Sequence, residues 1–506
     1  MSSDRLFTKE IGDNFTCVGE WWLPSGHDRC NPTLMHSGTL TFSQGEGIRL
    51  DIMGQLGRDQ QPKDLLLVPP FETIWGRSAE GELITLLNAH NLGMTLGTTG
   101  ATESYDVRTV FVSENAWVNP GKDITFKSLR LRYTHLAEWV GISGFQVPTP
   151  KEFNYFIKRK EAKITYKRPS DPKSIDVRNY AISIAFGNNW PGIRPGIQEA
   201  TIKQHTSILV KLLNSKEISL SEVPALIRGF QHFLSLLTYD DPIYPLIVEG
   251  EMRAENDQGG DEATATLRML YHRLGTKKPS TELSRHKMLF TFKDTARIWR
   301  SALNKLIVVE DDKLEPVYDQ FFAEYFSPSA YVEDRFMATI RAIEVFHRRT
   351  NTKDYYMKKE RYHKTLCKEF FEPVAKAKAA GKIDSSFRDR LQSQLKYGYE
   401  FSLRKRLDDL FTTYGEEFLT LFVDKKKNEF IDVVVDTRNW FTHFDEELRH
   451  RAVTDGEELA SLNLKLQLFM IALLLRHIGI RQEKIEDQFR HYKFNYLRRS
   501  QNSNPT

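Results

Sequence analysis

The first half of the chain consists of short runs in which apolar and polar residues alternate, and glycine and proline residues separate the runs. Alternation with a period of two, with many β-branched and aromatic residues, is typical of strands that bury one face. Several such strands separated by turn residues are typical of a sandwich or barrel. We therefore predict a β-rich region with a sandwich or barrel-like sheet. Its strands are expected at 17–23, 38–42, 48–52, 105–112, 163–166, 180–186, 243–248 and 267–272.

Two features within this half refine the picture. Between Ser219 and Leu237 apolar residues recur every three or four positions, which predicts an amphipathic helix with Ser221 as its cap. Trp21 and Trp22 are adjacent, and neighbouring side chains on a strand point to opposite faces. We interpret this pair as contacts within the fold rather than as a recognition surface.

From about Thr295 the pattern changes to helical spacing, and glycine and proline become rare. Thr454 with Glu457 matches a capping box, and Gly479 is a natural stop after the last strongly apolar helix. Helices are expected around 317–325, 336–346, 353–380, 387–412, 425–444 and 457–477. The pattern predicts an antiparallel helical bundle, and hence an α+β multidomain fold. We expect a β-rich region at 1–294, which a break between 150 and 240 would divide into two subdomains, and a helical region at 295–506.

Two segments of the helical region need a decision. Residues 431–435 include four β-branched residues, which local propensity would assign to a strand. Because the segments on both sides are helical, we predict a helix there too. The most apolar run, 468–475, is far shorter than the roughly 20 residues of a membrane span. We therefore expect a buried helix and no membrane segment.

Composition narrows the class of protein. The chain has 506 residues, of which 40% are hydrophobic and 27% charged, as in a soluble globular protein. A net charge of +4 excludes a uniformly basic nucleic-acid coat, so any RNA site must be a local patch. Three cysteines argue against a disulfide framework and a zinc site. With no signal peptide expected in 1–5, these features predict a cytoplasmic protein without a metal or cofactor.

The strongest candidate for chemistry is Arg438, followed by Asn439 and, five positions after the arginine, His443. A guanidinium binds two phosphate oxygens at once and keeps its charge, while a histidine exchanges protons near neutral pH. Five residues of regular helix advance about 7.5 Å and turn about 140°, so the two side chains converge only if the helix ends or bends near His443. Such a pair could bind a phosphodiester and move a proton at it.

The same spacing occurs elsewhere, which makes the motif weak by itself. On a strand, Arg130 and His135 would point to opposite faces, and Arg341 and His347 would diverge on a helix. The pair Arg29 and His36 lies in a loop-like stretch, and only its context argues against it.

The segment 436–445 resembles the ribonuclease motif of HEPN (higher eukaryotes and prokaryotes nucleotide-binding) domains. In the β-rich region, Trp21-Trp22-Leu23-Pro24 and 38–42 resemble the opening of an ApeA N-terminal domain. A motif late in a helical region that follows such a β-rich region resembles the arrangement of Apea-like HEPN proteins of anti-phage defence. The resemblance implies that Arg438 binds the scissile phosphate, that His443 handles protons, and that Asn439 supports the site. It also implies an acidic position at Glu344.

The resemblance further implies a metal-independent endoribonuclease. The RNA 2′-OH would attack the adjacent phosphate and leave a 2′,3′-cyclic phosphate and a 5′-OH. Such enzymes act as homodimers, with two motifs facing each other. The implied function is an abortive-infection effector that cleaves tRNA or another host RNA, with a phage-encoded trigger at the N-terminal region.

Two basic stretches are candidates for holding the RNA backbone. They are Lys425, Lys426 and Lys427, and Arg498 and Arg499 in a tail where basic and aromatic residues alternate.

Other interpretations of the same residues stay open. Arg438 and His443 could be surface groups paired with Asp436 or Asp445, and Glu344 could pair with Arg341 or Arg348. The protein could then be a non-catalytic HEPN scaffold that binds RNA or nucleotide. A β-domain that binds a carbohydrate or other small ligand, joined to a helical dimerisation unit, would likewise need no chemistry at Arg438.

Overall fold

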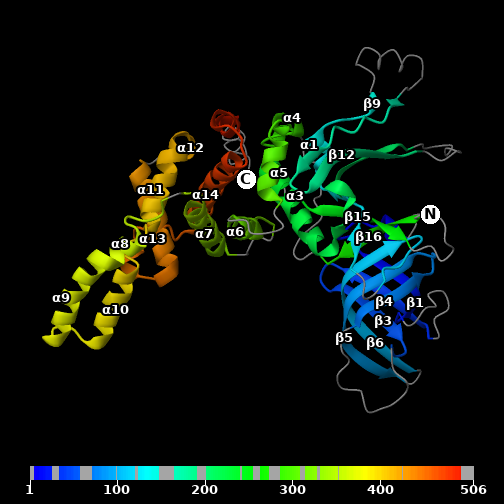
Figure 1. Ribbon diagram of the computed structural model, residues 1–506, viewed down its shortest axis with the longest axis horizontal. Coiled ribbons are helices and arrows are strands. Elements are labelled where there is room, and N and C mark those ends of the chain that lie inside the picture. Colours follow the sequence, from blue (N-terminus) through cyan, green and yellow to red (C-terminus); the bar gives the residue numbers. More distant parts are fainter. Residues whose placement is uncertain are drawn as a thin grey trace, which may run out of the picture. The chain divides into compact units, whose positions relative to one another are not determined.

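The computed structural model divides the chain into two compact units, Met1–Glu310 and Asp311–Thr506, and each is described by itself. The residues that the structure describes are 5–24, 34–56, 71–97, 100–119, 123–146, 164–190, 201–239, 242–254, 263–272, 285–307, 314–326, 331–351, 353–423 and 426–491. A β-rich unit followed by a helical unit confirms the predicted fold class (Figure 1).

The first six strands of unit 1 close into a barrel. Their hydrogen-bonding order is β6-β3-β2-β1-β4-β5, and β5 returns to β6. The strands are β1 (Phe15–Trp22), β2 (His36–Ser43), β3 (Gly47–Met53), β4 (Phe71–Ser78), β5 (Leu83–Gly97) and β6 (Gly100–Ser113). Closure leaves no free edge in this part of the sheet, and it confirms the expected barrel-like strands at 17–23, 38–42, 48–52 and 105–112.

Trp21 fills the barrel interior and is fully buried. Two glycines make room for its indole, since a Cβ at Gly76 would lie 2.3 Å from the ring, and one at Gly38 would lie 3.0 Å away. Trp22 points to the opposite face, where Trp117 packs edge-on against it at 5.8 Å. Both tryptophans therefore make contacts within the fold, as the sequence interpretation expected.

The remaining long strands extend the sheet beyond β6 in the order β16-β15-β8-β13-β12-β11. They are β8 (Ser128–Tyr133), β11 (Ile175–Val177), β12 (Tyr180–Asn189), β13 (Lys203–Leu212), β15 (Pro245–Ala254) and β16 (Ala263–Tyr271). Because β6 pairs with both β3 and β16, it belongs to the barrel and to the open sheet and joins them into one continuous sheet. Of the expected run at 163–166, residue 163 lies outside the described residues, and Thr165–Tyr166 form β10, which pairs with β9 (Phe145–Gln146).

Helices lie beside the open sheet (Figure 1). The expected helix is α3 (Val223–Thr238), but Ser221 does not cap it: Ser219 caps the short turn before α3, with Glu222 completing the capping box. The hydroxyl of Tyr133 at the end of β8 donates to the Ile227 carbonyl of α3 at 2.9 Å. Further helices among the described residues of this unit include α1 (Leu136–Val140), α4 (Phe292–Thr295) and α5 (Trp299–Leu306).

The division between the two compact units lies at Glu310. Helix α5, which follows residue 294, packs back onto unit 1. Its Trp299 packs edge-on against Phe292 of α4 at 5.2 Å, and α5 contacts α3.

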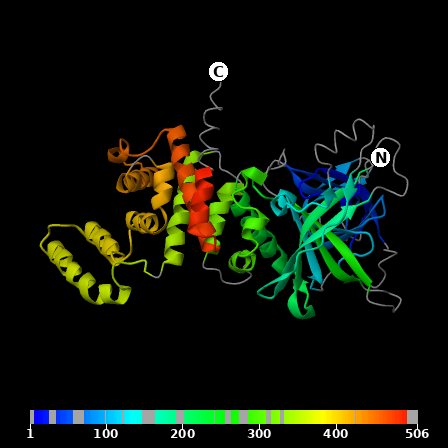
Figure 2. The ribbon, with the colours of Figure 1, turned by 90° about the horizontal axis from the view of Figure 1, so that it is seen from above.

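Unit 2 is a helical bundle built around α14 (Gly456–His477), which lies against α7 (Val332–Thr350) (Figure 2). By length and composition α14 could cross a membrane, but 61% of its apolar window is buried inside the protein. The run 468–475 is therefore a buried core helix, as predicted. Further described helices of the bundle include α6 (Glu315–Phe326), α11 (Leu403–Tyr414), α12 (Glu416–Phe422) and α13 (Lys427–His443).

The capping box at Thr454 is wrong by one residue. Asp455 caps α14, and its carboxylate accepts hydrogen bonds from the backbone N–H groups of Glu457 and Glu458 at 3.0 Å. Gly479 follows the helix with a φ of +106°, a conformation that favours glycine and confirms the predicted stop.

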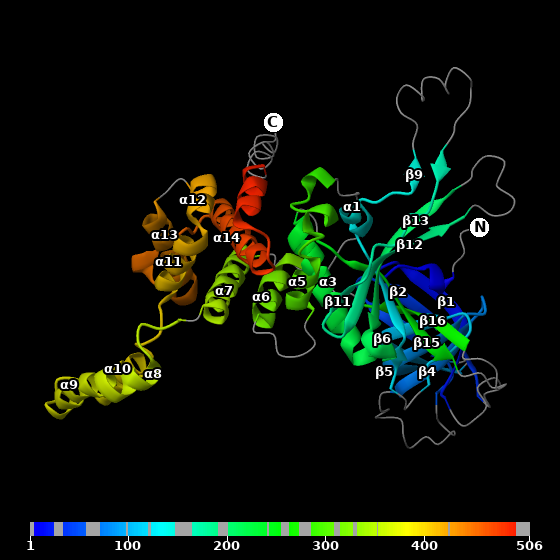
Figure 3. The same ribbon diagram turned by 45° about the horizontal axis from the view of Figure 1, so that its top comes forward.

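A helical hairpin leaves the bundle between α7 and α11 (Figure 3). It comprises α8 (Lys359–Tyr362), a π-helical turn, α9 (Lys368–Ala379) and α10 (Ser385–Lys396). At its base Tyr355 and Glu400 form an isolated antiparallel bridge. The single helix expected at 387–412 is thus two helices, separated at 397–402, because the chain must re-enter the bundle there.

Candidate functional site

The candidate motif lies on the last two turns of α13, which spans Lys427 to His443. Phe430, Ile431 and Val434 are buried on one face of this helix, so packing overrides the β propensity of 431–435. The helix ends at His443, because Phe444 adopts a left-handed conformation with φ +50° and its N–H donates to the Trp440 carbonyl. His443 is therefore the last helical residue, and about 140° of helical turn still separates the directions of the Arg438 and His443 side chains.

The motif side chains reach solvent to different extents. Arg438 and Asn439 are half-buried, and His443 is exposed. The guanidinium of Arg438 donates to the Asn439 amide oxygen at 3.0 Å, which restricts the arginine rotamer. The hydroxyl of Thr442 donates to the Arg438 carbonyl at 2.7 Å, so this side chain is bonded to the backbone of its own helix.

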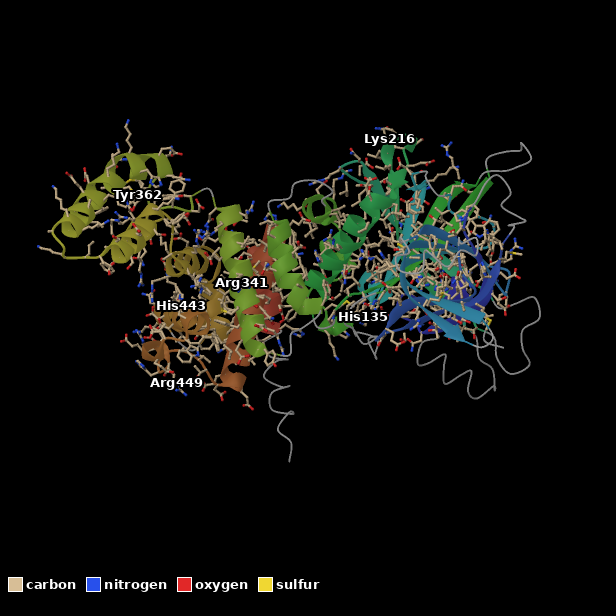
Figure 4. The ribbon with its side chains drawn as sticks, turned by 90° about the horizontal axis from the view of Figure 1, so that it is seen from below. His135, Lys216, Arg341, Tyr362, His443 and Arg449 are labelled. Atoms are coloured by element: carbon tan, nitrogen blue, oxygen red, sulfur yellow. The ribbon has the colours of Figure 1, made fainter. Side chains whose placement is uncertain are left out.

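Thr437 holds the segment that follows the helix, and the sequence interpretation did not single it out. Its side chain is fully buried, and its hydroxyl accepts a hydrogen bond from the Val453 N–H at 3.0 Å. Asp436 adds an ion pair with Arg451 at 3.8 Å. The sequence did contain a signal for this role: Thr437 is a polar residue on the helix face that is otherwise formed by apolar residues. Figure 4 labels His443 at the end of α13 and Arg449 in the segment held in this way.

Glu344 on α7 pairs with Arg348 at 3.2 Å and with the buried Arg406 of α11 at 3.9 Å. Phe336 of the same helix contacts Phe441, so the start of α7 lies beside the end of α13. Glu344 is eight residues further along α7, about 12 Å away from that contact. Its described partners match the alternative interpretation, with Arg348 rather than Arg341, and a supporting role at the motif stays a prediction.

A buried polar cluster surrounds Arg406. Both Arg406 and His347 have fully buried side chains, and a guanidinium nitrogen of Arg406 lies 3.2 Å from Nδ1 of His347. On the other side of the ring, Nε2 lies 3.4 Å from Asp409. Burial lowers the pKa of His347, the nearby Arg406 charge lowers it further, and Asp409 opposes both. These contacts give His347 a structural role.

Two protein-family models match the chain. The model described as ApeA N-terminal domain 1 matches residues 16–306, more than half of the chain. The model described as Apea-like HEPN matches residues 337–484, which include Arg438, Asn439 and His443. The chain belongs to the ApeA family. Comparison with curated proteins and with solved structures found no match. Membership of this family supports an HEPN-type anti-phage effector.

The basic residues predicted to hold RNA fall into three groups in the HEPN domain. Lys426 is exposed at the start of α13. Lys427 is committed to the fold, because its ammonium donates to Asp408 at 2.6 Å and to Thr412 at 2.9 Å across the α11–α13 contact. Lys425, Arg498 and Arg499 lie outside the described residues.

The decoy pairs separate as predicted where both members are described. Arg130 is exposed on β8 while His135 is buried beyond the strand end, and on α7 Arg341 is exposed while His347 is buried. Arg29 lies outside the described residues.

The apolar side chains of α7 and α14 are mostly buried in the bundle core, where the two helices pack on each other. The apolar surface beside the motif comes instead from Trp440 and Phe441, both half-buried, and from Phe444, which is 65% exposed and stacks edge-on with Trp440 at 5.7 Å. This aromatic group adjoins His443 directly in sequence.

Proposed function

We propose that the protein is a metal-independent HEPN endoribonuclease that acts as an abortive-infection effector. The observation that carries the proposal is the termination of α13 at His443, within a segment that the Apea-like HEPN model matches. An exposed imidazole and an arginine held by its neighbour thus lie on the last two turns of one helix.

In the proposed reaction, Arg438 binds the non-bridging oxygens of the scissile phosphate and stabilises the charge that develops on them. The RNA 2′-oxygen attacks the adjacent phosphorus and loses its proton to one imidazole, while the leaving 5′-oxygen receives a proton from another. The products are a 2′,3′-cyclic phosphate and a 5′-OH. Asn439 is a positioning residue, because its amide oxygen orients the guanidinium.

The proton count supports a homodimer. Arg438 and His443 point about 140° apart around the helix axis, and one motif supplies a single histidine. Two motifs that meet across a groove supply two imidazoles and two guanidiniums. The aromatic group of Trp440 and Phe444 lies beside the motif and offers apolar surface for that contact.

The α8–α10 hairpin is the element of unit 2 best suited to hold the RNA backbone. Between Lys359 and Lys396 it carries ten lysines and arginines against five acidic residues, a net charge of +5 that exceeds the +4 of the whole chain. Neither α9 nor α10 buries a side chain completely. Phe370 and Phe387 are 50% and 46% exposed and could stack on bases.

The biological target follows from the family and stays a proposal. We expect tRNA or another host RNA as the substrate, cleaved only during infection, with a phage-encoded trigger that acts through the ApeA N-terminal region.

A second candidate function, a non-catalytic HEPN scaffold, is favoured by one observation. Asp445, Glu446 and Glu447 follow the motif directly, and all three are exposed. Carboxylates next to His443 would repel an incoming phosphate unless a basic surface compensates for them.

The deciding experiment measures RNA cleavage by sequencing 5′-OH ends after induction of wild type, Arg438→Ala and His443→Ala, with purified protein assayed in EDTA. Both variants should fold and lose cleavage and toxicity, while His491→Ala, an exposed histidine elsewhere in the bundle, should behave as wild type. Absence of cleavage by the wild type would favour the scaffold, cleavage by His443→Ala at the wild-type rate would refute the assignment of His443, and strict Mg²⁺ dependence would exclude the proposed mechanism.

A further inference from the structure

The open sheet of unit 1 has two unlike faces. On β8 and β13, Leu129, Leu131 and Ile208 are buried on one face. The opposite face carries charged and polar side chains and forms an open groove of about 1350 Å³. Its floor includes Arg130, Arg132, Lys203, His205, Glu249 and Arg268. Arg130 and Arg132 on β8, and Lys203 and His205 on β13, are two positions apart, and side chains two positions apart on a strand point to the same face.

The charge of the groove is incompletely compensated. Arg268 pairs with Glu249 at 2.5 Å and Arg132 with Glu10 at 3.8 Å. Among the described residues, Arg130, Lys203 and Arg285, which also line the groove, have no ion pair, and all three are exposed. The positive charges are close enough to affect neighbouring groups. Burial is the largest cause that lowers the pKa of His205, and the charges of Arg132 and Lys203 lower it further.

The wall of the groove is fixed to the sheet. Gln204 donates to the Ile142 carbonyl and accepts from the Gly144 N–H, both at 2.8 Å, which holds the segment after α1 against β13 (Figure 3). Gly141 closes α1 with φ +63°, and a Cβ there would lie 2.3 Å from the Arg285 guanidinium. The glycine therefore lets Arg285 lie flat on the backbone at the rim.

Aromatic side chains continue the wall at one end. Phe145 lines the groove, the Tyr166 ring lies 4.7 Å from it, and Trp190 packs edge-on against Tyr166 at 5.8 Å. Trp190 is 65% exposed and follows the groove residue Asn189. Asn188 also lines the groove, and its amide nitrogen is buried without a hydrogen-bond partner.

We propose that this groove binds a single-stranded nucleic acid. Its volume exceeds the roughly 300–1,000 Å³ of small-molecule sites. Uncompensated cations beside exposed aromatic rings are the combination by which proteins track a phosphodiester backbone and stack bases. Arg130, Lys203 and Arg285 contact phosphates, and Phe145, Tyr166 and Trp190 contact bases. The site is separate from Arg438 and His443 and does not rest on their proposed chemistry.

The test uses the full chain with His443→Ala, so that RNA stays intact in the proposed mechanism. A fluorescent oligonucleotide of about eight nucleotides carries a photoreactive uracil, and fluorescence anisotropy and cross-link mapping are read together. RNA and DNA arms distinguish the two kinds of strand. ATP, duplex RNA and a polyglutamate peptide are the competitors.

We expect cross-links within 164–190, and at least tenfold weaker binding with a smaller salt dependence in Arg130→Gln/Lys203→Gln. Trp190→Ala should weaken binding by about tenfold. Lys216→Gln, an exposed lysine outside the groove (Figure 4), is the matched control and should leave affinity unchanged. Thermal unfolding confirms that each variant is folded.

Cross-links confined to unit 2, or affinity unchanged in Arg130→Gln/Lys203→Gln, would overturn the proposal. Binding of polyglutamate without binding of either strand would replace it with an acidic protein partner. In the proposed function, cleavage depends on Arg438 and His443 and not on the groove. Cleavage at the wild-type rate without strand binding in the groove would therefore count against the groove proposal alone. Strand binding in the groove without any RNA cleavage would count against the proposed function alone.

Discussion

At the scale of single residues, the conformation of the motif depends on side chains to which the proposed reaction gives no direct contact with RNA. Asn439 holds the Arg438 guanidinium at 3.0 Å, and Thr437 fastens the segment after the helix through Val453. A helix end is otherwise free to fray, and a site that needs a side chain at that end must restrain it. Thr437 and Asn439 supply this restraint from within the helix.

Replacing Thr437 by valine should detach the segment 444–455 while keeping the shape of the side chain. The Val453 N–H loses its acceptor, which should lower the free energy of unfolding by about 1–3 kcal/mol and reduce cleavage. Denaturant unfolding and limited proteolysis within 444–455 measure the two effects. Thr437→Ser keeps the hydroxyl and should protect the segment better. Equal protease sensitivity of the two variants would contradict this role.

His347 should make the protein less stable in mild acid. Burial and Arg406 lower its pKa below the ordinary 6.5, so the folded state binds this proton less readily than the unfolded state. The stabilisation is complete above the unfolded pKa and is lost as pH falls from about 6.5 through the folded pKa.

Thermal unfolding between about pH 7.5 and about pH 5.5 should therefore show a smaller loss of stability for His347→Gln than for wild type. His491→Gln, at an exposed position, should keep the wild-type dependence. The same slope in His347→Gln and wild type would mean that other groups dominate acid sensitivity.

At the scale of elements, the α8–α10 hairpin is the least supported part of unit 2. Its two main helices bury no side chain completely, and its base is held by the Tyr355–Glu400 bridge. Short isolated helices are marginal in water, so a partner that covers the hairpin would stabilise it. Its net charge of +5 makes a polyanion the complementary partner.

Neutralising Lys376, Lys378 and Lys382 to glutamine should weaken RNA binding and reduce its salt dependence, because up to three fewer phosphates would be contacted. Nitrocellulose filter binding across a salt series measures both quantities, in a His443→Ala background. The control is Lys293→Gln with Lys305→Gln, on helices of unit 1. An unchanged salt slope in the hairpin variant would show that RNA does not lie along it.

At the scale of the whole molecule, activity should require two chains. One motif provides one arginine and one histidine, whose directions diverge on α13. The segment held by Thr437 and Asp436 also contains the exposed His450. A single chain could therefore supply a second imidazole, and experiment must separate the two arrangements.

Mixing Arg438→Ala chains with His443→Ala chains tests the composite groove. Mixed dimers hold one Arg438 and one His443 and should differ in activity from either parent, and sedimentation should show a dimer at concentrations where wild type is active. His450→Ala should keep full activity. A monomer that cleaves at the full rate, or loss of cleavage in His450→Ala with no recovery on mixing, would place the second imidazole within one chain.

Local pattern was sufficient for the strands at 17–23 and 38–42, for the helical character after 295, and for the buried run at 468–475. These follow from periodicity, which depends only on neighbouring residues. The same local information placed caps on Ser221 and Thr454, whereas Ser219 and Asp455 act as caps. The expected and the actual cap lie within two positions of each other and are chemically similar, so only backbone geometry distinguished them.

The sequence by itself determined the barrel-like and helical classes, the family and the position of the candidate motif, because each is carried by residues close together along the chain. Tertiary structure decided where α13 ends, that Glu344 pairs with Arg348 and Arg406, and that Lys427 pairs with Asp408. It also decided that Arg130, set aside as half of a decoy motif, lies in the basic groove of unit 1. These features join residues distant in sequence, and long-range packing rather than local periodicity brings them together.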